Sequence, residues 1–143
     1  MSAAKLYTPE LLGLAVELAQ HPPLAQAAVR GEARSPTCGS TLAMDFDVDG
    51  EGRIQRLGLR VHACAVGQAA AAIFARHAGG RNAEDIATAL QQLESWLSEG
   101  GDLPPWPDLA IIEAARAYPG RHGAILLPWR AALAALSSEA PAS

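Results

Sequence analysis

The side chains with the most to offer chemically are the two cysteines of the chain, Cys38 and Cys64, and the histidines His62 and His122. Cysteine thiolates bind zinc and iron–sulfur clusters, and a histidine imidazole can complete such a site. A closed site of either kind takes four ligands, which two cysteines cannot supply alone. Cys38 and Cys64 are therefore the candidate ligands, and His122 could add an imidazole to them. His62 is a further imidazole, which the strand pattern places on an outward face.

The two cysteines also have uses that need no metal. Cys64 stands at the start of a predicted helix, where the helix macrodipole stabilises a thiolate that could accept and relay persulfide sulfur. A structural disulfide between Cys38 and Cys64 is a second alternative, although thiols stay reduced in the compartment expected for this chain. A third is that both are ordinary small buried residues.

Two strands and a turn must position these residues. Between residues 40 and 48, and again between 57 and 61, apolar residues alternate with other types, which is the period of a strand with one buried face. The Asp-Gly-Glu-Gly run between them has hairpin-turn chemistry, and the carboxylates of Asp45 and Asp47 fall on the solvent face. Because paired hairpin strands are antiparallel, Cys38 and Cys64 should meet at one end of the sheet.

Helix signals occupy most of the remaining chain. Helices are predicted from Pro9 to about residue 20, over 64–77, from the Asn82 cap to about residue 99, over 107–118, and finally up to about Leu136. Residues 27–34 supply a candidate edge strand. The predicted fold class is therefore α+β, a small antiparallel sheet of two to three strands with helices packed on one face.

Two residues set further expectations. Pro128 should fall in the first turn of the last helix, because proline disrupts a helix interior. Trp106, which lies among three prolines, is a candidate exposed contact for a partner.

Length and composition indicate one domain over residues 1–143, with its core at about 6–136 and a frayed tail at 137–143. The net charge of −4 argues against a nucleic-acid surface. There is neither a run of about 18 apolar residues nor a secretory signal, so no membrane association is expected. We expect a soluble cytoplasmic protein.

Three features carry a family resemblance. Cys38-Gly39 precedes the predicted hairpin, Cys64 opens an Ala-rich helix, and a Tyr-Pro-Gly-Arg-His-Gly-Ala-Ile-Leu-Leu-Pro-Trp run occupies 118–129. In this order, over about residues 6–136, they resemble the scaffold proteins of iron–sulfur cluster assembly, the IscU/SufU/NifU N-terminal family. The late run is most similar to the SufU-type branch. The resemblance implies a SufE/NifU-like fold, in which helices cover an antiparallel sheet.

The chain departs from the family pattern at its ligands, which are three cysteines and an aspartate. Cys38 and Cys64 match the first two cysteines. Ser40 occupies the place of the aspartate, and Ala124 that of the third cysteine when Arg121 and Trp129 are aligned. The resemblance thus identifies a divergent member with two of the four ligands, and places His122 two residues from the missing third cysteine.

The resemblance implies a carrier and not an enzyme, a scaffold-like protein that holds metal, cluster or sulfur transiently on Cys38 and Cys64. Its implied cargo is an iron–sulfur cluster, shared by the four thiolates of a homodimer, or zinc; a third version binds no metal. Its implied partners are a cysteine desulfurase and recipient apoproteins. Two other functions stay open, a non-metal pseudo-scaffold acting as a protein-interaction or regulatory module, and a thiol-dependent sulfur transferase that uses Cys64.

Overall fold

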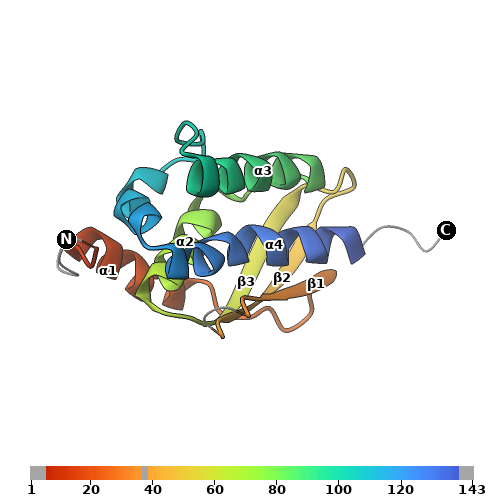
Figure 1. The fold of residues 1–143 in the computed structure, drawn as a ribbon. Helices are drawn as coiled ribbons and strands as arrows, with labels where there is room; N and C mark the ends of the chain where they lie inside the picture. Colours follow the sequence, from red (N-terminus) through yellow and green to blue (C-terminus); the bar gives the residue numbers. More distant parts are fainter. Residues whose placement is uncertain (1–5, 37–38, 139–143) are drawn as a thin grey trace.

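The computed structural model describes residues 6–36 and 39–138 and has the predicted α+β architecture. Three antiparallel strands form one sheet in the order β1-β2-β3, and the helices gather on one of its faces (Figure 1). The elements are α1 (Pro9–Glu17), the 3₁₀ turn η2 (Leu18–Gln20), β1 (Val29–Arg34), β2 (Thr41–Val48), β3 (Ile54–His62), α2 (Ala65–His77), α3 (Ala83–Glu99), the 3₁₀ helix η3 (Leu109–Ala117), the 3₁₀ turn η4 (Pro119–Arg121) and α4 (His122–Ser138).

The predicted hairpin is confirmed, from the pair Thr41 and His62 at one end to Val48 and Ile54 at the other. Its turn is held by the carboxylate of Asp49, which accepts hydrogen bonds from the backbone N–H groups of two later turn residues at 2.8 and 2.9 Å. The candidate edge strand is also confirmed as β1, which pairs with β2. Alternate β2 side chains are buried in the core as the pattern predicts: Leu42, Met44 and Phe46.

The expectation that Asp45 faces solvent is wrong, because Asp45 is only 3% exposed. The connector between η2 and β1 crosses the outer face of the sheet and covers this carboxylate. Asp45 accepts a hydrogen bond from the backbone N–H of Leu24 at 3.0 Å and lies 3.5 Å from the guanidinium of Arg30. Burial of the charge is thus compensated by a donor and a cation.

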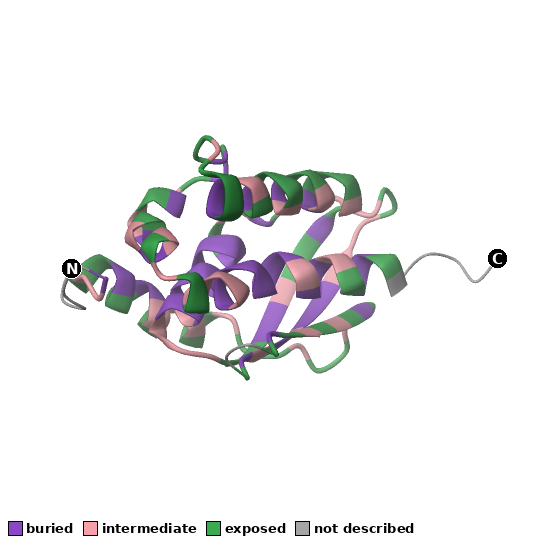
Figure 2. Ribbon diagram, viewed as in Figure 1, coloured by how far each residue is buried: buried purple, intermediate pink, exposed green. Residues whose placement is uncertain are grey.

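Helix α2 lies at the centre of the molecule and is buried along most of its length (Figure 2). Its alanines and glycine let α1, α4 and η3 approach it closely, which explains its small-residue composition. Helix α3 begins at the predicted Asn82 cap, where Asn82 and Asp85 form a capping box in which each side chain accepts from the other residue's backbone N–H.

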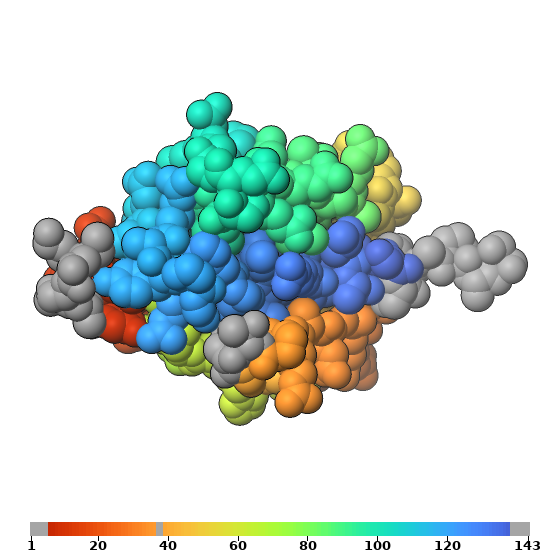
Figure 3. All heavy atoms as spheres, in the orientation of Figure 1, coloured from red at the N-terminus to blue at the C-terminus, as the bar shows by residue number. Residues whose placement is uncertain are grey.

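Helix α4 begins six residues before Pro128, so the prediction that Pro128 lies in the first turn is wrong. An interior proline costs about 3 kcal/mol of helix stability. Here the residues on both sides of Pro128 are buried, and this burial offsets the cost. The helix passes between α3 and β1 (Figure 3) and lies so close to the sheet that a Cβ on Gly31 would clash with the backbone of Ala131 and Ala135.

The segment predicted as a helix over 107–118 is a 3₁₀ helix, η3. Its buried residues Leu109, Ile112 and Ala115 recur every three positions, which aligns them on one face of a helix with three residues per turn. Trp106, which precedes it, is 4% exposed, so the expectation of an exposed partner contact is wrong. Among the residues that the structure describes, no helix is long and apolar enough to cross a membrane.

Candidate functional site

The candidate site lies beyond the last paired row of the sheet, which joins Arg34, Thr41 and His62 across the three strands. On one side of this row a tight turn leads from β1 to β2, closed by a hydrogen bond from the N–H of Ser35 to the carbonyl of Ser40 at 2.8 Å. On the other side, β3 leads through Ala63 into α2. The two chain segments that carry the cysteines therefore leave the sheet at the same end, while Cys38 itself lies outside the described residues.

Cys64 is the N-cap residue of α2, with φ −67° and ψ 172°. Its thiol is free, partly exposed, and makes no capping hydrogen bond to the helix backbone. The local backbone is held instead by Gln68, whose N–H donates to the Cys64 carbonyl and whose Nε2 donates to the Ala63 carbonyl, both at 2.9 Å. An anionic group on this sulfur would stand at the positive end of the helix macrodipole.

The first turn of α4 packs against this end of α2. A Cβ on Gly67 would lie 3.2 Å from the Cβ of Ala124 and 2.7 Å from that of Ala63. Next to it, a Cβ on Gly123 would clash with the side chain of Ser35 in the β1–β2 turn. Position 124, which the resemblance aligns with a third cysteine, therefore lies beside the first turn of α2, and it presents a fully buried methyl group.

The two candidate imidazoles lie in different settings. His122 opens α4, and its Nε2 hydrogen-bonds the backbone carbonyl of Arg116 at 2.8 Å. Because a carbonyl only accepts, Nε2 carries a proton, and in the neutral imidazole the lone pair is on Nδ1. His62 is exposed on the outer face of the sheet, as its position in the strand predicts.

Ser40, at the place of the family's aspartate, is 5% exposed. Within residues 6–36 and 39–138, no three His, Cys, Asp or Glu side chains are gathered in a way that could hold a metal ion. The described part of one chain thus offers the Cys64 thiol without a completed set of ligands, and any larger set depends on Cys38 or on a second molecule.

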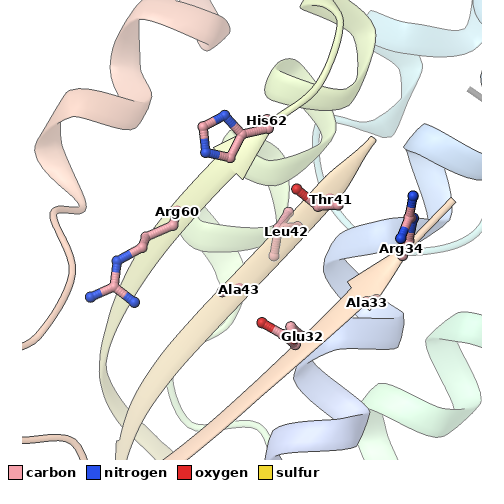
Figure 4. A pocket seen from close by; sticks show the side chains of 8 residues that line it. All are labelled: Glu32, Ala33, Arg34, Thr41, Leu42, Ala43, Arg60 and His62. Carbon is pink, nitrogen blue, oxygen red and sulfur yellow. The ribbon is translucent and has the colours of Figure 1, made fainter. Parts of the chain in front are cut away.

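One feature at this end of the sheet was missed by the sequence analysis. Its outer face carries a groove of about 450 Å³ between Arg34 and Arg60, with Thr41 and His62 at the end nearest Cys64 (Figure 4). Part of the signal was present in the sequence, because the alternation over residues 57–61 places Arg60 on the outward face, whereas no such alternation marks Arg34.

No family model matches the sequence, and no curated protein matches it either. Several solved structures are similar to this chain. A NifU-like protein (N-terminal) from Brucella abortus, described as nitrogen-fixing, superimposes with a TM-score of 0.88 and 26% identity, covering 97% of each chain.

Two further structures share the fold at lower identity. A protein of Fervidobacterium islandicum AW-1 that is assigned as an iron–sulfur cluster assembly scaffold for the SUF system has a TM-score of 0.80 and 20% identity, over 94% of this chain and 99% of that one. A hypothetical protein has a TM-score of 0.72 and 15% identity, over 89% of this chain and 96% of its own. The fold of this chain is therefore similar to that of the NifU-like (N-terminal) and SufU structures.

Proposed function

We propose that the protein takes part in iron–sulfur cluster assembly as a carrier, with Cys64 and Cys38 as the residues that hold its cargo. The observation that carries this proposal is the free, partly exposed thiol of Cys64 at the N-cap of α2, at one end of a scaffold-type fold. The chain acts by binding and release, and it performs no turnover of its own.

Two cysteines suit two kinds of cargo. A [2Fe–2S] cluster needs four thiolates, which two copies of the chain related by a two-fold axis would provide. A sulfur atom carried as a persulfide needs only one thiolate. In that case the Cys64 thiolate attacks the outer sulfur of a donor persulfide, a new S–S bond forms at Cys64, and the donor leaves as its thiolate, so that no external oxidant is required. A cysteine desulfurase would be the donor, and apoproteins the recipients.

Zinc is the third candidate cargo, and it would need His122 or His62 as added ligands. The lone pair on Nδ1 of His122 is open to this role, since Nε2 is engaged by the Arg116 carbonyl. His62 would have to turn from the outer face of the sheet. Zinc binding by one chain therefore predicts a dependence on His122.

The test is to purify the protein anaerobically and measure iron, zinc and acid-labile sulfide per chain, before and after cluster reconstitution. About one [2Fe–2S] per dimer, lost in both Cys38→Ser and Cys64→Ser, is the expected result for a shared cluster. Sulfur carriage predicts a mass increase of one sulfur atom after incubation with a desulfurase and cysteine, absent in Cys64→Ser. Neither metal nor added sulfur on the wild-type chain would contradict the carrier.

Ala124→Cys is a matched variant that adds a thiol, whereas the cysteine-to-serine variants remove one. It returns a thiol to the position aligned with the third cysteine, beside Ala63 and Gly67. The added sulfur enters a fully buried space, so we expect a loss of about 1–2 kcal/mol in stability. If the two existing cysteines bind cluster or zinc, this variant should retain the metal longer against a chelator. Unchanged retention, in a folded variant, would mean that position 124 does not face the cargo.

A second function is a module that keeps the fold for protein interaction or regulation and carries no cargo. The buried methyl of Ala124 at a ligand position favours it. A Cys38→Ser/Cys64→Ser double variant separates the two functions in a cell that depends on this protein, because only the carrier would lose activity.

A further inference from the structure

The outer face of the sheet, opposite the helices, is bare next to the candidate site. Six side chains that point to this outer face form two rows. One row is Arg34, Thr41 and His62, and the other is Glu32, Ala43 and Arg60. The small side chain of Ala43 leaves a hollow between the charged ones, which is the groove of about 450 Å³ (Figure 4).

The groove is closed at its far end and open toward Cys64. The connector between η2 and β1 covers the next row of the sheet, where the backbone N–H of Leu24 donates to Asp45 at 3.0 Å. Gly58, opposite Asp45, has no room even for a Cβ under the backbone of Pro22. A chain lying in the groove can therefore leave it only past the edges of the sheet or over the end that carries Cys64.

The charges of the groove are unusual within this molecule. Eight of the ten arginines in the described residues have a carboxylate, a carbonyl, a hydroxyl or an aromatic ring as partner: Arg30, Arg53, Arg56, Arg76, Arg81, Arg116, Arg121 and Arg130. Within residues 6–36 and 39–138, Arg34 and Arg60 have none, and both line this groove. Two cations without an internal counterion are thus held on either side of one hollow.

The spacing of the two arginines indicates the shape of their ligand. They stand on β1 and β3, two strand spacings apart and one row out of register, so their Cα atoms are separated by about 10 Å across the sheet and about 7 Å along it. Their side chains point apart in Figure 4. An extended chain with two carboxylates matches this separation, and a single small anion does not. The other two corners are Glu32 and His62, and Glu32 would repel a third carboxylate and so select the register.

We propose that the groove docks an extended acidic segment of a partner protein, with carboxylates paired to Arg34 and Arg60. The docked segment would hold its protein over the end of the sheet that carries Cys64. That the partner is the donor or recipient of the cargo rests on the function proposed above; the docking itself does not.

A fluorescein-labelled decapeptide of alternating glutamate and serine is a suitable probe, followed by fluorescence anisotropy at low salt. We expect saturable binding that weakens about tenfold in the Arg34→Ala/Arg60→Ala double variant, the sum of two partly exposed ion pairs. Arg56→Ala is the matched control, since Arg56 is on the same face of β3, beyond the connector, and is paired with Asp47. It should change the affinity less than twofold. Ala43→Phe, which fills the hollow without changing charge, should weaken binding at least as much as the double arginine variant.

Three results would overturn the proposal: no saturable binding by the wild-type chain, an equal loss in Arg56→Ala, or full competition by inorganic phosphate below millimolar concentration, which would indicate a small-anion site. The Cys38→Ser/Cys64→Ser variant should bind the peptide as the wild type does. Arg34→Ala/Arg60→Ala should still load sulfur or cluster when the reagents are small molecules. Cargo loading tests the carrier function and peptide binding tests the docking groove, so each hypothesis can fail without the other.

Discussion

At the level of single residues, the missing side chain of Gly67 sets how closely the first turn of α2 approaches α4. A Cβ there would lie 2.7 Å from the Cβ of Ala63 and 3.2 Å from that of Ala124. Both neighbours belong to the candidate site, so this contact fixes the distance between the Cys64 helix and position 124.

Gly67→Ala should therefore destabilise the protein by about 1–3 kcal/mol, although alanine is the better helix former by about 1 kcal/mol. Gly13→Ala is the matched control, because a Cβ on this glycine of α1 would meet nothing within 4 Å. It should stabilise by about 0.5–1 kcal/mol. Urea unfolding of both variants measures the difference. Equal free energies of unfolding would show that α4 can move away at no cost.

At the level of elements, one cation joins the ends of α1 and α2 to the loop before η3. Arg76 donates to both carboxylate oxygens of Glu17 at 2.7 Å and lies 3.2 Å from Asp108, which His77 also contacts at 2.7 Å. The hydrogen bond from Arg76 lowers the pKa of Glu17, and the hydrogen bonds from His77 and then Arg76 lower the pKa of Asp108. Asp108 is held with φ 72°, a conformation that aspartate tolerates better than most residues.

Arg76→Gln should lower the free energy of unfolding by about 1–2 kcal/mol at pH 7, a value kept small because the arginine is partly exposed. The carboxylate pKa values are lower in the folded protein, so this stabilisation is complete above their unfolded values near 4 and is lost as the pH falls through the folded ones. Unfolding curves between pH 7 and 2.5 should converge for wild type and variant. Arg130→Gln, which breaks a surface pair with Glu94, should cost no more than about 0.5 kcal/mol. A difference independent of pH would contradict the ion-pair explanation.

Most of the elements that the sequence predicted have a regular apolar period: β2, β3, α1, α2 and α3. The burial of Asp45 could not be predicted, because its cover comes from an irregular connector with no period. The sequence predicted a helix at η3 without its type, although the spacing of three between Leu109, Ile112 and Ala115 indicates a 3₁₀ helix. At the site, the type of Cys64 and its place at a helix start were readable, but the contact between Gly67 and Ala124 joins segments far apart in sequence.

At the level of the whole molecule, an aromatic cluster fastens the proline-rich loop to the core. The ring of Trp106 stacks on Phe74 and meets Trp129 edge-on, both with centroids 5.3 Å apart, while Arg81 covers it at 3.9 Å. Its indole N–H donates to the Ile73 carbonyl at 3.1 Å. One side chain thus connects α2, α4 and the loop after α3.

Trp106→Ala should cost about 3–5 kcal/mol in the free energy of unfolding, through the cavity left among these rings. Leu103→Ala in the same loop should cost less than about 0.5 kcal/mol, because Leu103 is 44% exposed. Guanidinium unfolding followed by circular dichroism measures both. A loss below 1 kcal/mol for Trp106→Ala would mean that the loop is not anchored by this ring.

The close packing of α4 on β1 has a consequence for folding during synthesis on the ribosome. Gly31 meets Ala131 and Ala135, which are made about 100 residues later. At about 5–20 residues per second, β1 waits about 5–20 seconds for the helix that packs on its apolar side. Until α4 emerges, α2 can cover part of the sheet, since Phe74 contacts Phe46, but β1 and the adjoining part of β2 lack the helix that packs on them. The last helix is therefore the step that ends their exposure to aggregation.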